Sequence, residues 1–209
     1  MEYRILDMEK DPRREQFRYF QSLANPYVGT TVPVDVTAAV IRRRKTGESL
    51  FLSLLYCLVR AANAVPQLRR RLLPDGTAVE YEYCRSSHIV PLQDDAYCYC
   101  TLDCRCPWEE FLPYAQAEAE RAKSAPSLDD GGQADLLFLS CVPWLSFTAL
   151  VQPTPFPADS NPRIIWGKCQ EENGRWIAPV ALLAHHALVD GIHIARFYQA
   201  LEEELRRMG

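Results

Sequence analysis

The sequence predicts an α+β fold, with helices packed on a mixed β-sheet in a single domain spanning residues 1–209. Three observations support this prediction. The chain has 209 residues, 48% of them hydrophobic and 24% charged, which provides enough apolar surface for one sizeable core. Helix-like and strand-like segments are interspersed without the strict alternation of a wholly parallel sheet. Residues 48–65 are apolar almost all round, which indicates a helix buried within the domain.

Local signals place the helices along the chain. Asp11 and Pro12 have the residue types of an N-cap and a first helical position, so a helix is predicted to begin there. The buried helix at 48–65 stops before Pro66. A short helix is predicted to begin at Thr37, after Asp35. Two further helices are predicted at residues 107–123 and 191–208.

Seven segments are predicted to be strands, because they are rich in apolar and β-branched residues and are bounded by Gly, Pro, Asn or Asp. They are residues 28–36, 78–90, 96–102, 136–142, 145–151, 163–170 and 176–186. Residues 78–90 and 96–102 are joined by a polar connection, which predicts a meander. A Pro-rich connection at 153–162 precedes residues 163–170.

Charge and hydropathy exclude two classes of partner. The formal net charge is −4 and the sequence pI is about 5.6, so no overall cationic field is available to hold a nucleic acid. No apolar run approaches the roughly 20 residues that span a bilayer. The first 15 residues carry acids where a signal peptide would be apolar. We therefore expect a cytoplasmic protein with neither a nucleic-acid nor a membrane partner.

The eight cysteines are expected to be reduced, because a chain of this size without an export signal does not need a disulfide framework. Cys98, Cys100, Cys104 and Cys106 form two C-x-C pairs, which raises the alternative of a zinc site. Structural zinc sites usually space their ligands more widely, and on a strand Cys98 and Cys100 would point together into a core. We therefore expect no metal.

The segment from His185 to His193 concentrates the chemistry, since it holds three of the four histidines and Asp190 where an apolar run meets a predicted helix. His186 should emerge at the edge of the core, where a neutral imidazole could take a proton from a hydroxyl. A histidine with purely structural contacts is the alternative. His186, Asp190 and His193 could bind a metal together only if they lay on one face of a helix. Gly191 suggests that the helix begins only at that residue, so the three side chains are not expected to share a helical face.

Four segments together resemble the chloramphenicol acetyltransferase family. HHALVDGIHIARFYQAL (185–201) is similar to the family's HHxxxDGxH signature, and FLSCVPWLSF (138–147) to its FxSxxPWxxF segment. FQSLANPYVGTTVPVDVT (20–37) and NAVPQLRRRLLPDG (63–76) resemble two earlier family segments in the same order. HxxxDG alone is less specific, because dihydrolipoamide acyltransferase domains and other CoA-dependent acyltransferases share it.

The resemblance implies an acetyl-CoA-dependent O-acetyltransferase. His186 would be the general base that activates an acceptor hydroxyl for direct attack on the thioester, without an acyl-enzyme. Ser140 would donate a hydrogen bond to the oxyanion, and Asp190 would orient the site through an ion pair. The family's homotrimeric organisation implies that His186 faces a pocket completed by another copy.

The resemblance also places acceptor-binding residues at Tyr27, Val28 and Tyr99. The chain departs from the family at Val28, where an aromatic residue is common, and at Trp166, which aligns with a hydroxyl-bearing residue. A bulky indole there would reshape the pocket, so the expected acceptors include compounds similar to chloramphenicol as well as chloramphenicol itself. The alternatives are acylation of another small alcohol or amine, and a ligand-binding relative without turnover.

Overall fold

A computed structural model describes residues 2–129 and 131–209 of the chain. The helices are α1 (Arg14–Gln21), α2 (Thr37–Thr46), α3 (Leu50–Asn63), α4 (Trp108–Ser124) and α5 (Gly191–Arg207), with a 3₁₀ helix η1 (Pro66–Arg69). The strands are β1 (Tyr3–Ile5), β2 (Tyr27–Asp35), β3 (Arg70–Leu72), β4 (Ala78–Tyr81), β5 (Arg85–Pro91), β6 (Tyr97–Leu102), β7 (Leu136–Val142), β8 (Arg163–Gly167), β9 (Gln170–Glu172) and β10 (Arg175–His185). None of the described helices is long and apolar enough to cross a membrane.

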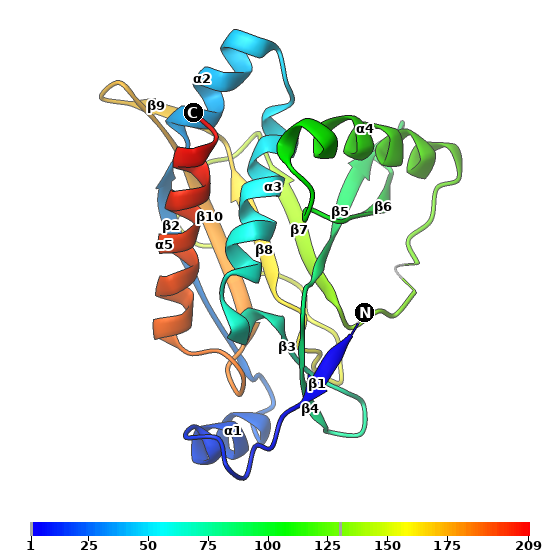
Figure 1. Cartoon of the computed structure of the whole chain (residues 1–209), viewed down its shortest axis with the longest axis vertical. Helices are drawn as coiled ribbons and strands as arrows, with labels where there is room; N and C mark the ends of the chain where they lie inside the picture. The colour runs from blue at the N-terminus through cyan, green and yellow to red at the C-terminus, as the bar shows by residue number, and fades with distance from the viewer. Residues whose placement is uncertain (1, 130) are drawn as a thin grey trace.

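The strands form the predicted mixed sheet and a smaller one. The main sheet has the order β2-β10-β8-β7-β5-β6, with β9 paired to β10. Its β5–β7 and β7–β8 pairs are parallel and its other pairs are antiparallel. Strands β1, β4 and β3 form the second sheet. Figure 1 shows α3 and α5 side by side against the main sheet.

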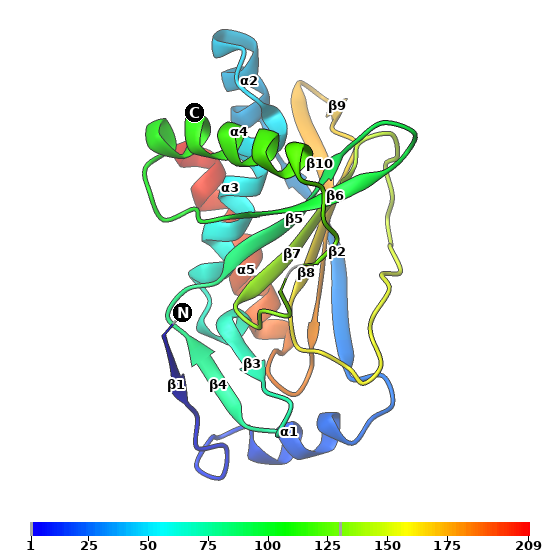
Figure 2. The same ribbon diagram turned by 90° about the vertical axis from the view of Figure 1, so that its right-hand side faces the viewer.

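The two faces of the main sheet have different surroundings. Figure 2 shows α3 and α5 on one side, whereas the connection from β7 to β8 runs along the other, where no described helix packs. Leu139, Ile164 and Leu182 are in register and at most 3% exposed, so they belong to the core on the helix-covered face. Because side chains alternate along a strand, the neighbouring residues Ser140 and Ile165 point to the open face.

The sheet forks between β5 and β7. Their pairing ends at His88 and Leu139, whereas β5 continues beside β6 to Pro91 and β7 continues beside β8 to Val142. Ser140 is therefore the first β7 residue beyond the fork. The separation of the strands creates space on both sides of the sheet at this point.

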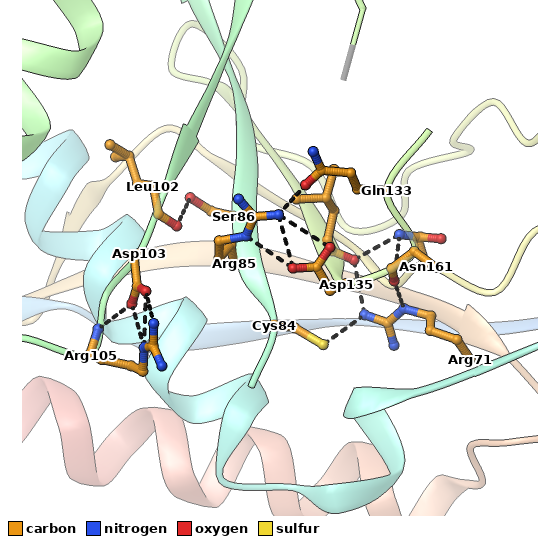
Figure 3. Close-up of polar contacts among 12 residues, drawn as sticks. Arg71, Cys84, Arg85, Ser86, Leu102, Asp103, Arg105, Gln133, Asp135 and Asn161 are labelled. Carbon is orange, nitrogen blue, oxygen red and sulfur yellow. Dashed lines mark hydrogen bonds and ion pairs between the residues drawn. The ribbon is translucent and has the colours of Figure 1, made fainter. Parts of the chain in front are cut away.

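A buried polar network fixes the start of β7 relative to β8 (Figure 3). The guanidinium of Arg71 is fully buried and donates hydrogen bonds to the carbonyl oxygens of Ala134 and Leu136 at 2.7 and 2.9 Å. Asn161, two residues before β8, donates to the same two oxygens. These bonds join the residues at the start of β7 to those just before β8, and so they fix the relative positions of the strands that carry Ser140 and Ile165.

Two strand predictions were wrong. Residues 145–151 form no strand, because β8 already has β7 and β10 on its two sides and offers no edge for them. Residues 78–90 divide into β4 and β5, which belong to different sheets. The division lies at Cys84, whose backbone N–H and carbonyl both bond the side chain of Asn63.

Candidate active site

His186 follows the last residue of β10, and contacts of its backbone and its ring hold it in place. Its backbone N–H donates to the carbonyl of Pro26 at 2.7 Å, and its ring stacks on Phe20 with a centroid separation of 3.6 Å. Its Nδ1 lies 3.0 Å from the carbonyl oxygen of Val189. A carbonyl only accepts, so this contact assigns the proton of the neutral ring to Nδ1. Nε2 then carries the lone pair, and the half-buried ring can accept a proton there.

Asp190 forms the ion pair that the sequence predicted. It is the N-cap of α5, and its Oδ1 accepts from the N–H of Gly191 at 2.7 Å. Its Oδ2 lies 3.4 Å from Nη2 of Arg13. The Gly191 hydrogen bond and, to a smaller extent, the Arg13 charge hold the pKa of Asp190 below its ordinary value.

Arg13 ties the turn after β10 to the start of α1. Besides its contact with Asp190, it donates to the backbone carbonyls of His186 and Ala187 at 3.1 and 3.3 Å. Sequence reasoning anticipated a cation beside Asp190 but did not identify Arg13. No local pattern marks an arginine so distant along the chain as the partner.

The two other histidines of the segment are structural. Burial lowers the pKa of both His185 and His193 to about 4, so both are neutral at pH 7. Nδ1 of His193 accepts from the N–H of Asp190 at 2.9 Å and completes the capping box of α5. Among the described residues, no three His, Cys, Asp or Glu side chains gather as metal ligands would. Cys98 and Cys100 are buried in the core.

Ser140 lines a cavity of about 660 Å³ on the open face, which we call the open-face cleft. Its lining includes the predicted Tyr99 and, from the strands around the fork, Tyr97, Phe138, Arg163 and Ile165. Tyr27 lies at its border, because its hydroxyl is 2.9 Å from Oδ1 of Asp159, another lining residue. Burial, with the Asp159 charge, raises the pKa of Tyr27 to about 12.

Val28 and Trp166, which were predicted to bind the acceptor, are absent from the described lining of the open-face cleft. Val28 alternates with Tyr27 and packs against the core. Trp166 is 2% exposed and contacts Phe51, with ring centroids 5.1 Å apart, on the helix-covered face. Ile165 is in register with Ser140, so the alignment that placed Trp166 there was displaced by one residue, and a one-residue shift exchanges the faces of a strand.

Trp166 instead lines a second cavity of about 610 Å³, which we call the helix-side cavity. It combines cations with aromatic rings: Arg43, Arg44, Lys168, Phe51, Trp144 and Trp176. The guanidinium carbon of Arg44 lies 4.9 Å from the ring centroid of Trp176. Ile89, the first β5 residue beyond the fork, lines both cavities, which therefore meet at the break in the sheet.

Among the described residues, the open-face cleft is lined by Ser140 but not by His186. Ser140 is in register with Ile165 and, through it, with Ala181, four residues before His185. At 3.3 Å per residue, Ala181 and His185 are about 13 Å apart along β10. His186 lies one residue further from the level of Ser140. His186 is absent from the described lining of the open-face cleft. His186 and Ser140 therefore lie apart in a single copy of the described chain.

A forked mixed sheet between two cavities, together with the HxxxDG turn at its edge, defines a protein of the CoA-dependent acyltransferase class. The chloramphenicol acetyltransferase family matches residues 1–202. The chain therefore belongs to the chloramphenicol acetyltransferase family and is an acetyltransferase.

Individual relatives agree with this assignment. The chain is 26% identical to the chloramphenicol acetyltransferase of Klebsiella sp over 204 residues, covering 96% of this chain and 93% of that protein. It is also 26% identical to that of Clostridium perfringens, with 97% and 98% covered. A solved chloramphenicol acetyltransferase structure superposes with a TM-score of 0.85 at 28% identity, covering 98% of this chain and 100% of that one. The cubic core of the pyruvate dehydrogenase multienzyme complex shares the fold, with a TM-score of 0.68 at 19% identity over 93% and 88% of the chains.

Proposed function

We propose that this protein transfers the acetyl group of acetyl-CoA to a hydroxyl of a small acceptor, chloramphenicol or a similar compound. The observation that carries the proposal is the contact between Nδ1 of His186 and the carbonyl of Val189, which leaves Nε2 as a proton acceptor. The relatives named chloramphenicol acetyltransferase support the choice of substrates.

The proposed reaction is a direct transfer. Nε2 of His186 takes the proton of the acceptor hydroxyl while its oxygen attacks the thioester carbonyl carbon. The hydroxyl of Ser140 donates a hydrogen bond to the oxyanion that forms. The carbon–sulfur bond then breaks, and the departing CoA thiolate takes the proton from His186. Asp190 and Arg13 act as positioning residues, since they fix the backbone of the turn that carries His186.

The chemistry of the two cavities supports one substrate in each. Acetyl-CoA carries phosphates and an adenine ring, which favour the cations and indoles of the helix-side cavity. The open-face cleft contains Ser140 and the rings of Tyr97, Tyr99 and Phe138, which suit a compact acceptor. The two ligands would meet beside Ile89, where the cavities adjoin.

A further copy of the chain would complete each site in a homotrimer. His186 follows the end of β10 and Ser140 lies on the open face of β7, so we propose that His186 of one copy faces Ser140 of the next. Exposed apolar side chains on the β7–β8 connection support this packing. Trp144, Val151 and Phe156 are 79%, 97% and 98% exposed, which is unusual for large apolar residues that stay in water.

Release of the CoA thiol tests the proposal. We expect the purified protein to release thiol from acetyl-CoA when chloramphenicol is present, and mass spectrometry should show one acetyl group added to the acceptor. Release with other alcohols or amines but not with chloramphenicol would move the function to a different acceptor. Binding of acetyl-CoA without release from any acceptor would contradict an enzymatic role.

A further inference from the structure

An ion pair occupies one wall of the open-face cleft. Nη1 of Arg163 lies 2.8 Å from Oδ1 of Asp159, and Nη2 lies 2.9 Å from Oδ2. The side chains are 12% and 27% exposed, so both are largely withdrawn from water. Both residues line the cleft that contains Ser140. The wall of the proposed acceptor site therefore carries a charged pair, although an apolar wall would be easier to cover with a ligand.

The hydrogen bonds of Arg163 leave a defined part of the guanidinium available. Three of its five N–H donors are used: two on the carboxylate of Asp159, and a second Nη1 donor on the carbonyl of Asn161 at 3.1 Å. Among the described residues, no hydrogen bond uses Nε–H or the second Nη2 donor. These two N–H groups are adjacent and parallel, and such a fork matches two oxygens held in one plane.

Aromatic rings hold this guanidinium in place. Its central carbon lies 5.8 Å from the ring centroid of Tyr27 and 5.4 Å from that of Phe138. The Tyr27 hydroxyl contacts the same carboxylate as Arg163. The donor pair is therefore fixed before a ligand arrives, and little side-chain freedom is lost when a ligand binds.

We propose that Arg163 determines acceptor specificity by binding a planar pair of oxygens, such as a nitro group or a carboxylate, at the end of the acceptor remote from the reacting hydroxyl. The inference rests on the proposed function of the cleft. Arg163 pairs with Phe138, two residues before Ser140, so strand geometry separates the Arg163 and Ser140 backbones by about 8 Å. One aromatic ring with a short hydroxyl-bearing chain spans such a distance.

Three acceptors that differ at a single position test this specificity. They are chloramphenicol, its analogue with a carboxylate in place of the nitro group, and its analogue with hydrogen there. The measured quantity is kcat/KM for each acceptor, in the native protein and in Arg163→Lys, which keeps the charge and removes the fork. Arg60→Lys is the matched control, because Arg60 also pairs with a carboxylate, Glu204, but lies on the helix-covered side.

We expect the native protein to prefer one oxygen-bearing acceptor over the hydrogen analogue by about tenfold or more. The preferred compound shows whether the neutral or the anionic group fits beside Asp159. Arg163→Lys should reduce that preference below about threefold, whereas Arg60→Lys should retain it. Equal kcat/KM for all three acceptors, or a preference unchanged in a folded Arg163→Lys, would overturn the inference while leaving acetyl transfer intact.

Direct binding separates the two proposals if no acceptor is acetylated. In that case, equilibrium dialysis of the same three compounds measures their affinities without turnover. Tighter binding of an oxygen-bearing compound that is lost in Arg163→Lys would support the specificity of the cleft, even though the proposed function had failed. Equal affinities, or no binding of any compound, would contradict the role of Arg163.

Discussion

The proposed base is defined by the contacts of a single ring. The Val189 carbonyl fixes which nitrogen of His186 carries the proton, and the Phe20 ring fixes the plane of the imidazole. The neighbouring His185 is 4% exposed and bonds the turn through its own Nδ1, which accepts from Ala187 at 3.3 Å. Two adjacent histidines thus differ because the strand ends between them.

Single substitutions should separate the roles of base and oxyanion donor. His186→Ala should lower kcat by about a thousandfold or more, because proton removal and orientation of the acceptor are both lost. Ser140→Ala should lower kcat by about a hundredfold, the effect of one missing oxyanion donor. Thiol release at saturating substrates measures both values. Ser87→Ala removes a hydroxyl from another wall of the same cleft, and a loss as large as that of Ser140→Ala would contradict the assignment.

Packing around the β7–β8 connection makes one glycine essential. A Cβ at Gly167 would lie 2.7 Å from the carbonyl oxygen of Leu145 and 2.7 Å from a ring carbon of Pro179. Gly167→Ala should therefore lower the free energy of unfolding by about 1–3 kcal/mol and displace the connection. Urea unfolding measures the change. Gly191→Ala is the control, since a Cβ there meets nothing within 4 Å, and equal losses in the two variants would disprove the explanation.

The turn that carries His186 depends on α1 through Arg13. Arg13→Met removes the hydrogen bonds to two backbone carbonyls and the ion pair with Asp190, so the turn should lose its fixed geometry. We expect kcat to fall by about ten- to a hundredfold while KM changes little. Arg13→Lys should recover part of kcat because it keeps the charge.

Its neighbour Arg14 provides the control. Arg14 is on the same helix but pairs only with Glu15 among the described residues. Arg14→Met should therefore keep both kcat and KM. A rise in KM with unchanged kcat in Arg13→Met would instead indicate that Arg13 contacts a substrate.

Sequence patterns predicted most of the helices and strands correctly. The buried helix α3 and the acid-to-base charge gradient of α4 follow from local residue types, and both helices form close to the expected ranges. Residues 145–151 were predicted wrongly because strand formation also requires an available sheet edge, which no local pattern encodes. Arg13 and Arg163 were missed for the same reason: their partners and surroundings are set by tertiary packing.

At the scale of the whole molecule, buried imidazoles should make stability depend on pH. Burial lowers the pKa of His88, His185 and His193 to about 4, below the ordinary value of 6.5. Above pH 6.5 these groups are neutral in the folded and in the unfolded protein, so they do not reduce the free energy of unfolding. As the pH falls from 6.5 toward 4, the unfolded chain binds protons that the folded protein does not, so stability decreases. Each histidine contributes about 1.4 kcal/mol per pH unit within this window.

Urea midpoints between pH 7.5 and 4.5 measure this effect. His88→Phe should make the dependence shallower by about one proton, because one of the three groups is removed. The Nδ1 of His88 is also buried without a hydrogen-bond partner in the described structure, so Phe should be tolerated there at pH 7. An unchanged slope in His88→Phe would show that this imidazole binds its proton over the same pH range in the folded and unfolded states, which would contradict the lowered pKa.

The separation of His186 from Ser140 leads to a complementation test of the assembly. If His186 of one copy meets Ser140 of the next, His186→Ala and Ser140→Ala should restore each other, although each is nearly inactive alone. In a cyclic trimer that contains both variants, one of the three interfaces joins an intact histidine to an intact serine. Mixed trimers, purified through a different tag on each variant, should therefore recover about one third of the native activity.

The control is a mixture of His186→Ala with the double variant, which contains no intact histidine and should stay inactive. Light scattering should give three times the 23.9 kDa of the chain for every preparation. No recovery in verified mixed trimers would mean that both side chains act from one copy, which would require the turn after β10 to move toward the open-face cleft. Recovery near one third requires the two side chains to act across a boundary between copies.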